Sequence, residues 1–168
     1  MNGIQTKRAV YYGLLIACLA GALLTVFLPF TYELISGDRE SFLAPVSILH
    51  YITNDITAEL LGWYSELAEF FDLFFRIFAL WTVILQVLSL LRVLGSLNDE
   101  VSSFVAVRLG MGPVLGICLF ALLLGLGIRN HIHLHQWMGS PFWLPPIWPL
   151  AGLLLNCASL RLARALNP

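Results

Sequence analysis

Charged residues are scarce in this chain of 168 residues: 11% are Asp, Glu, Lys or Arg, whereas 59% are hydrophobic. Soluble domains average about 25% charged and about 45–50% apolar residues. The composition therefore excludes an ordinary soluble domain and a disordered chain. The formal net charge of −1 supplies no basic surface for nucleic acid. A small polytopic membrane protein with a single domain is expected.

Cysteine is also rare, and its three copies, Cys18, Cys118 and Cys157, all lie inside apolar stretches. A secreted disulfide scaffold is thereby excluded, and the lack of a Cys-x-x-Cys motif removes the basis for thiol–disulfide exchange. The sequence also contains no nucleophile elbow, no phosphate-binding loop and no paired catalytic carboxylates. We therefore expect a protein that is not an enzyme.

Long hydrophobic runs are what the chain does contain. A helix that crosses a bilayer needs roughly 20 mostly apolar residues. Four stretches qualify, over residues 10–30, 70–94, 109–128 and 146–163. The sequence therefore predicts an all-α bundle of four transmembrane helices.

The basic residues indicate the orientation of these helices, because Lys and Arg accumulate in cytoplasmic loops. With the N-terminus inside, six of the nine basic residues fall on the inner side: Lys7, Arg8, Arg92, Arg108, Arg161 and Arg164. Both termini are therefore predicted to be cytoplasmic, with a bacterial inner membrane as the default location. Eight of the ten acidic residues fall in or beside the first outer loop: Glu33, Asp38, Glu40, Asp55, Glu59, Glu66, Glu69 and Asp72.

The first outer loop, residues 31–69, opens with a turn at Ser36-Gly37-Asp38. Beyond it, apolar residues recur at steps of three and four, at Leu49, Ile52, Ile56, Leu60 and Trp63. This spacing predicts an amphipathic helix that begins at Pro45, a favoured first helical residue. Such a helix either caps the bundle or meets a protein partner.

The second outer loop, residues 129–145, contains three histidines at alternate positions, His131, His133 and His135. In an extended strand these imidazoles share one face and suit a transition metal, which His50 could join. The other interpretation is a polar interfacial loop without a metal. Four tryptophans suit the membrane interface: Trp63, Trp137, Trp143 and Trp148.

Within the spans, Asp72 and Arg76 are four residues apart and can form an ion pair on one helix face. We expect this pair to anchor the helix. Gln86 and Asn156 are isolated amides, suited to hydrogen bonds between helices. Small residues that allow close helix packing are Gly13 and Gly21 in the first span and Gly112 and Gly116 in the third.

Two halves of the chain show weak similarity. Leu14–Leu24 matches Val114–Leu124 at five of eleven positions. The alternatives are a tandem repeat of two helical hairpins and shared membrane composition. The chain has a first span that ends at a proline, then a long outer loop, then a second span. This order loosely resembles one module of paraquat-inducible protein A-type membrane proteins, and the segments that carry the resemblance are LPFTYELISGD and LWTVILQVLSLL. No diagnostic motif matches, and no family is assigned.

These features favour a non-enzymatic accessory or structural subunit that docks on a larger membrane complex through its helix faces and outer loops. Its expected partners are membrane lipid and other membrane subunits, and not nucleic acid. The alternatives are a metal-handling membrane protein that uses the histidine cluster and a small oligomeric transporter. No pattern demands a cofactor, and a transition metal or a lipophilic cofactor stays open.

Overall fold

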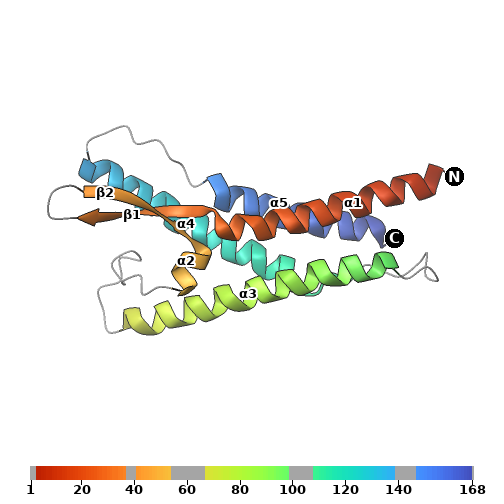
Figure 1. Cartoon of the computed structure of the whole chain (residues 1–168), viewed down its shortest axis with the longest axis horizontal. Helices are drawn as coiled ribbons and strands as arrows, with labels where there is room; N and C mark the ends of the chain where they lie inside the picture. The colour runs from red at the N-terminus through yellow and green to blue at the C-terminus, as the bar shows by residue number, and fades with distance from the viewer. Residues whose placement is uncertain (1–2, 37–40, 54–66, 99–107, 139–146, 168) are drawn as a thin grey trace.

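The computed structural model describes residues 3–36, 41–53, 67–98, 108–138 and 147–167. The elements follow in the order α1 (Gly3–Leu24), the 3-10 helix η1 (Thr25–Phe27), β1 (Pro29–Ser36), β2 (Ser41–Ser47), α2 (Ile48–Thr53), α3 (Leu67–Asn98), α4 (Gly112–Met138) and α5 (Ile147–Leu166). The long helices form an elongated bundle with both chain termini at one end and the strands at the other (Figure 1). We call these the terminus end and the hairpin end.

In the described part of the chain, three helices are long and apolar enough to cross a membrane, over Lys7–Phe27 in α1 and η1, Asp72–Ser96 in α3 and Gly112–Ile132 in α4. This result fits an integral membrane protein. The fourth predicted span, residues 146–163, is not confirmed: α5 forms a helix but is not among the three. Its polar and charged residues lower its hydropathy, at Asn156, Ser159, Arg161 and Arg164.

An antiparallel β-hairpin of residues 29–36 and 41–47 includes the first three residues of the helix that was predicted to start at Pro45. Tyr32 of β1 pairs with Pro45 of β2, so the helix prediction is wrong at this residue and the fold is mostly helical rather than all-α. Proline is tolerated here because both strands of a two-stranded sheet are edges. Helix α2 begins at Ile48, after Ser47, whose hydroxyl accepts a hydrogen bond from the His50 N–H at 3.1 Å. Residues 54–66, which include Trp63, lie outside the described residues.

Helix α4 continues to Met138, ten residues beyond the predicted end of its span. The loop predicted to begin at residue 129 is therefore helical as far as residue 138. The physical reason is visible in the sequence, because no glycine or proline interrupts the chain between Gly127 and Gly139.

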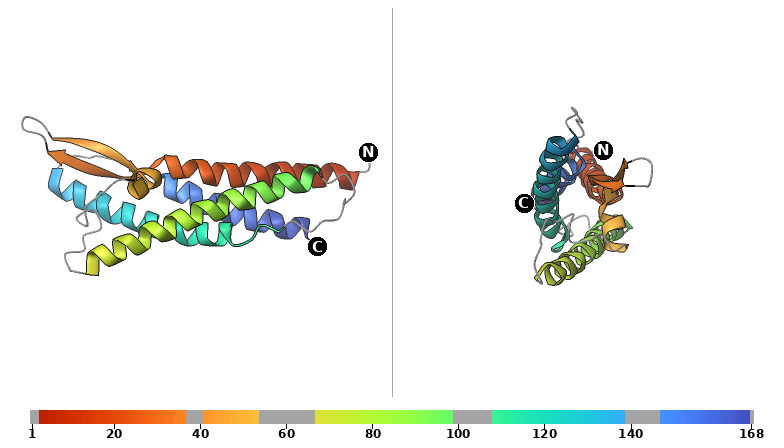
Figure 2. Two further views of the ribbon diagram at one scale, coloured as in Figure 1. Left: turned by 60° about the horizontal axis from the view of Figure 1, so that its bottom comes forward. Right: turned by 90° about the vertical axis from the view of Figure 1, so that its left-hand side faces the viewer.

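The bundle contains two separate apolar clusters. One, at the hairpin end, is formed by Val26, Phe30, Val46, Ile48, Tyr51, Ala79, Leu119, Phe120 and Leu123. The other, at the terminus end, is formed by Leu15, Leu19, Val93, Leu109, Ala163 and Leu166. The first cluster joins the hairpin and α2 to the helices, and an end-on view shows α2 between the hairpin and α3 (Figure 2).

Candidate functional site

Three side chains join α2 to α3 at the hairpin end. The Tyr51 hydroxyl donates a hydrogen bond to Oδ1 of Asp72, and Arg76 Nε lies 2.8 Å from Oδ2 of the same carboxylate. The Arg76 guanidinium also lies over the Tyr51 ring, with Cζ 5.3 Å from the ring centroid. We call Tyr51, Asp72 and Arg76 the clasp. The Asp72–Arg76 pair, expected only to anchor its own helix, thus also holds a segment 21 residues away in sequence.

Aromatic rings enclose the tyrosine of the clasp. Phe30 and Phe75 meet the Tyr51 ring edge to face, with centroids 6.4 and 5.6 Å away. Only 1% of Tyr51 is exposed. Burial, and then the hydrogen bond to Asp72 and the charge of that carboxylate, raise the pKa of Tyr51. The phenol therefore stays protonated and available as a donor in neutral solution.

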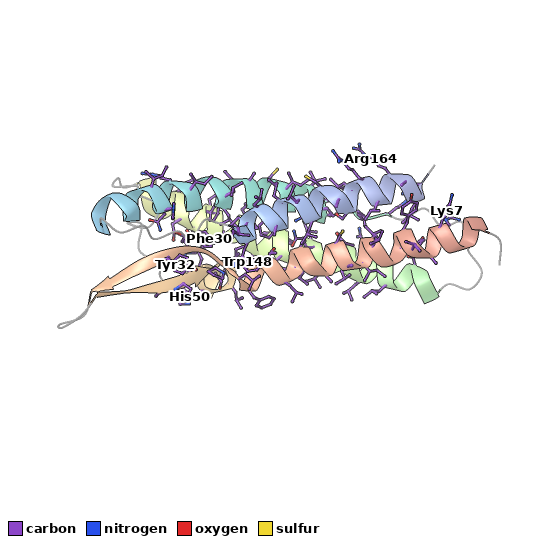
Figure 3. The ribbon with its side chains drawn as sticks, turned by 90° about the horizontal axis from the view of Figure 1, so that it is seen from above. Lys7, Phe30, Tyr32, His50, Trp148 and Arg164 are labelled. Carbon is purple, nitrogen blue, oxygen red and sulfur yellow. The ribbon has the colours of Figure 1, made fainter. Side chains whose placement is uncertain are left out.

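A second contact fixes the hairpin to α4. The side-chain amide nitrogen of Asn130 lies 2.8 Å from the backbone oxygen of Tyr32 and 2.5 Å from Oγ1 of Thr31, and it donates to both. An isolated two-stranded hairpin is marginally stable in water. The Asn130 amide and the clasp therefore hold the hairpin and α2 at defined positions on the bundle. Figure 3 shows Phe30 and Tyr32 at this end, with His50 on the hairpin side.

A polar layer lies between the two apolar clusters. Gln86 Nε2 on α3 donates to Oδ1 of Asn156 on α5 at 3.1 Å, and Asn156 Nδ2 donates to the backbone oxygen of Gly152 at 2.8 Å. Both amide side chains are buried, with 3% of Gln86 and 0% of Asn156 exposed. They join α3 to α5, and no ionisable residue is among the buried residues of this layer in the described part of the chain.

The predicted packing glycines fall into two groups. A Cβ atom on Gly116 would overlap the amides of Gln86 and Asn156, and one on Gly112 would overlap α3 at Leu85 and Ser89. Gly21 lies close to a side chain of α5, because its Cβ would be 3.1 Å from Leu155. Gly13 lies on an exposed face of α1, with no described atom within 4 Å of the Cβ position. Three of the four glycines therefore pack inside this chain.

The three alternate histidines lie on a helix rather than on a strand. An α-helix turns about 100° per residue, so positions 131 and 135 lie one turn apart and position 133 lies on the opposite side. The premise that all three share one face is therefore wrong. Among the described residues, no three His, Cys, Asp or Glu side chains are grouped as a metal site. Metal binding was not tested by these observations and stays a prediction; His50, on α2, is exposed.

Of the four tryptophans predicted to lie at the membrane interface, two are among the described residues. Trp148 is the second residue of α5; it is 43% exposed and lies toward the hairpin end (Figure 3). Trp137 lies in the last turn of α4, whereas Trp143 lies outside the described residues.

Searches against protein-family models, curated proteins and solved structures found no match. The interpretation of the site therefore depends on its own residues. Sequence reasoning missed Tyr51 and Asn130. Tyr51 lies one residue before Ile52 of the apolar stripe, and this position could have identified it as a buried side chain with a polar hydroxyl. Asn130 was hidden because residue 130 was assigned to a loop.

Proposed function

We propose that this chain is a non-enzymatic accessory subunit of a membrane complex, which docks on its partner at the hairpin end. The observation that carries the proposal is the double attachment of the hairpin and α2, through the clasp and through Asn130. Binding surfaces gain affinity when they are held in place before the partner arrives, because less conformational entropy is lost on association.

Charge indicates the kind of surface that would fit. Eight of the ten acidic residues lie between positions 33 and 72, together with one basic residue, Arg39. A partner that meets this segment is expected to present basic groups, because complementary charge guides association and selects partners. We propose that the hairpin end faces the outside of a bacterial inner membrane, that α5 is the fourth crossing, and that both termini are cytoplasmic. The excess of Lys and Arg at the terminus end supports this orientation.

Purification of the tagged chain from its native membrane in mild detergent tests the proposal. The expected result is a partner protein in a fixed ratio to the chain, and a lower ratio in Asn130→Ala, which removes one of the two polar attachments of the hairpin. Ile128→Ala is the matched control, since Ile128 is exposed on the same helix two residues earlier. A chain that purifies alone, or an Asn130→Ala variant that keeps the partner in the same ratio, would contradict docking at the hairpin end.

A further inference from the structure

Exposed basic side chains from several helices surround the terminus end. Five belong to this group: Lys7 on α1, Arg92 on α3, Arg108 before α4, and Arg161 and Arg164 on α5. Within the described residues, none of the five has an ion-pair partner. Figure 3 shows Lys7 and Arg164 on the helices α1 and α5 toward this end. The terminus end therefore carries concentrated positive charge that the described residues do not neutralise.

Helices α1 and α5, which carry three of these basic residues, pack against each other. Arg8 Nη2 donates to the backbone oxygen of Leu166 at 3.5 Å, which ties the start of α1 to the end of α5. The apolar cluster at the terminus end lies directly next to these groups and includes Ala163 and Leu166. The candidate span of α1 begins at Lys7, so the basic groups are expected at the boundary between the hydrocarbon core of the membrane and water.

Apolar side chains extend from the basic groups along both helices. Val10 and Leu14 follow Lys7 at three and seven residues, on the same face of α1, and are 55% and 48% exposed. On α5, Leu154 precedes Arg161 by seven residues and is 59% exposed. Each helix therefore presents a positive group followed by an exposed apolar track toward the membrane centre. An anionic lipid matches this order, with its phosphate at the boundary and its acyl chains along the helix.

We propose that the terminus end binds the headgroup phosphate of an anionic phospholipid at α1 and α5, through Lys7, Arg161 and Arg164. Basic groups at the membrane surface attract anionic lipid by roughly 1 kcal/mol each, which corresponds to about fivefold in affinity. The three groups lie at the same end of two helices that pack against each other, which favours a bound lipid over a loose layer of counter-ions. The site is separate from the hairpin end and does not depend on the docking function.

Native mass spectrometry of the purified full chain tests the site, by titration with phosphatidylglycerol and with phosphatidylcholine of the same acyl chains. The wild type is expected to retain phosphatidylglycerol more tightly. In the triple variant Lys7→Gln, Arg161→Gln, Arg164→Gln, this preference should fall by about fivefold for each charge removed. The control Arg129→Gln, at the other end of α4, should keep the preference, and so should the charge-conserving variant Lys7→Arg, Arg161→Lys, Arg164→Lys.

Three outcomes would overturn the proposal. One is equal retention of the two lipids by the wild type. Another is an unchanged preference in the triple variant, provided that circular dichroism shows both proteins helical to the same extent. The third is displacement of the lipid by inorganic phosphate at the same concentration, which would indicate a site for a free anion. Neither the presence nor the loss of a protein partner changes the lipid preference that this experiment measures.

Discussion

Gln86 on α3 and Asn156 on α5 are joined by a hydrogen bond of 3.1 Å at the level where α4 passes with Gly116. The bond from Asn156 Nδ2 to the Gly152 carbonyl fixes which end of the Asn156 amide faces α3. Gln86 must then present its nitrogen to Asn156. Bonds of this kind between membrane helices contribute about 0.6 kcal/mol on average. The pair therefore defines how three helices align more than it adds to stability.

Replacement of Gly116 tests this alignment. Gly116→Ala places a methyl group on the two amides and should lower the free energy of unfolding by about 1–3 kcal/mol, as overpacked sites do. Thermal unfolding in detergent measures the effect. Gly125→Ala is the matched control, because no described atom lies within 4 Å of its Cβ position and the site is exposed on the same helix. Equal thermal midpoints for the two variants would contradict the close approach at Gly116.

Tyr51→Phe should loosen α2 from α3. The variant removes a hydrogen bond to a charged group, typically worth about 1.5–3 kcal/mol when it is well formed, while the Asp72–Arg76 pair remains. Hydrogen exchange should rise in α2 and in the hairpin and stay unchanged at the terminus end. Tyr11→Phe is the control, because Tyr11 is 42% exposed on α1. Unchanged protection of α2 in Tyr51→Phe would show that the clasp is not needed.

The clasp also predicts a dependence on alkaline pH. The pKa of Tyr51 is raised in the folded protein above the unfolded tyrosine value of about 10. The stability that it contributes is therefore fully present below about pH 10 and is lost as the pH rises through the folded value. The difference in tyrosinate absorbance between wild type and Tyr51→Phe isolates this phenol. Ionisation of Tyr51 at or below pH 10 would contradict its burial beside Asp72.

The sequence predicted three of the membrane-spanning helices because their apolar runs are long enough to cross the hydrocarbon core of a bilayer, and it also indicated the amides that join α3 to α5. It misassigned the segment around Pro45, because a proline that suits the first turn of a helix also suits an edge strand, and helix α2 begins only at Ile48. Tyr51 could not be connected to Asp72 from spacing alone, since the contact depends on how α2 packs on α3. The contact of Asn130 with the hairpin could not be predicted for the same reason, because its two partners lie 98 and 99 residues away in sequence.

Cysteine labelling tests the proposed orientation. In a chain whose native cysteines are replaced, a cysteine at Ser41 or Ser140 should react with an impermeant reagent from outside, and one at Ser96 only after the membrane is opened. The reason is the excess of Lys and Arg beside Ser96 and the termini. Labelling of Ser96 from outside would reverse the topology, and protection of Ser140 would place the start of α5 on the inner side.

Elemental analysis of protein purified without a histidine tag tests the metal alternative. With positions 131, 133 and 135 on one helix, we expect less than about 0.1 metal per chain at neutral pH, because position 133 lies on the opposite side of the helix from the other two positions. Stoichiometric metal that is lost below about pH 6.5, where imidazole becomes protonated, would instead favour a metal-handling protein. His131→Ala should then lower the occupancy.

Site-specific photo-cross-linking in the native membrane tests docking at the hairpin end most directly. A photoreactive residue at Pro45, which is exposed on β2, should give one discrete protein adduct. The same residue at Leu154, 59% exposed on α5, should give lipid adducts only. The Pro45 adduct should fall when Asn130→Ala removes the hydrogen bonds that hold the hairpin on α4. A Pro45 probe that captures no protein, or the same protein adduct from both positions, would contradict the proposal that the hairpin end is the docking surface.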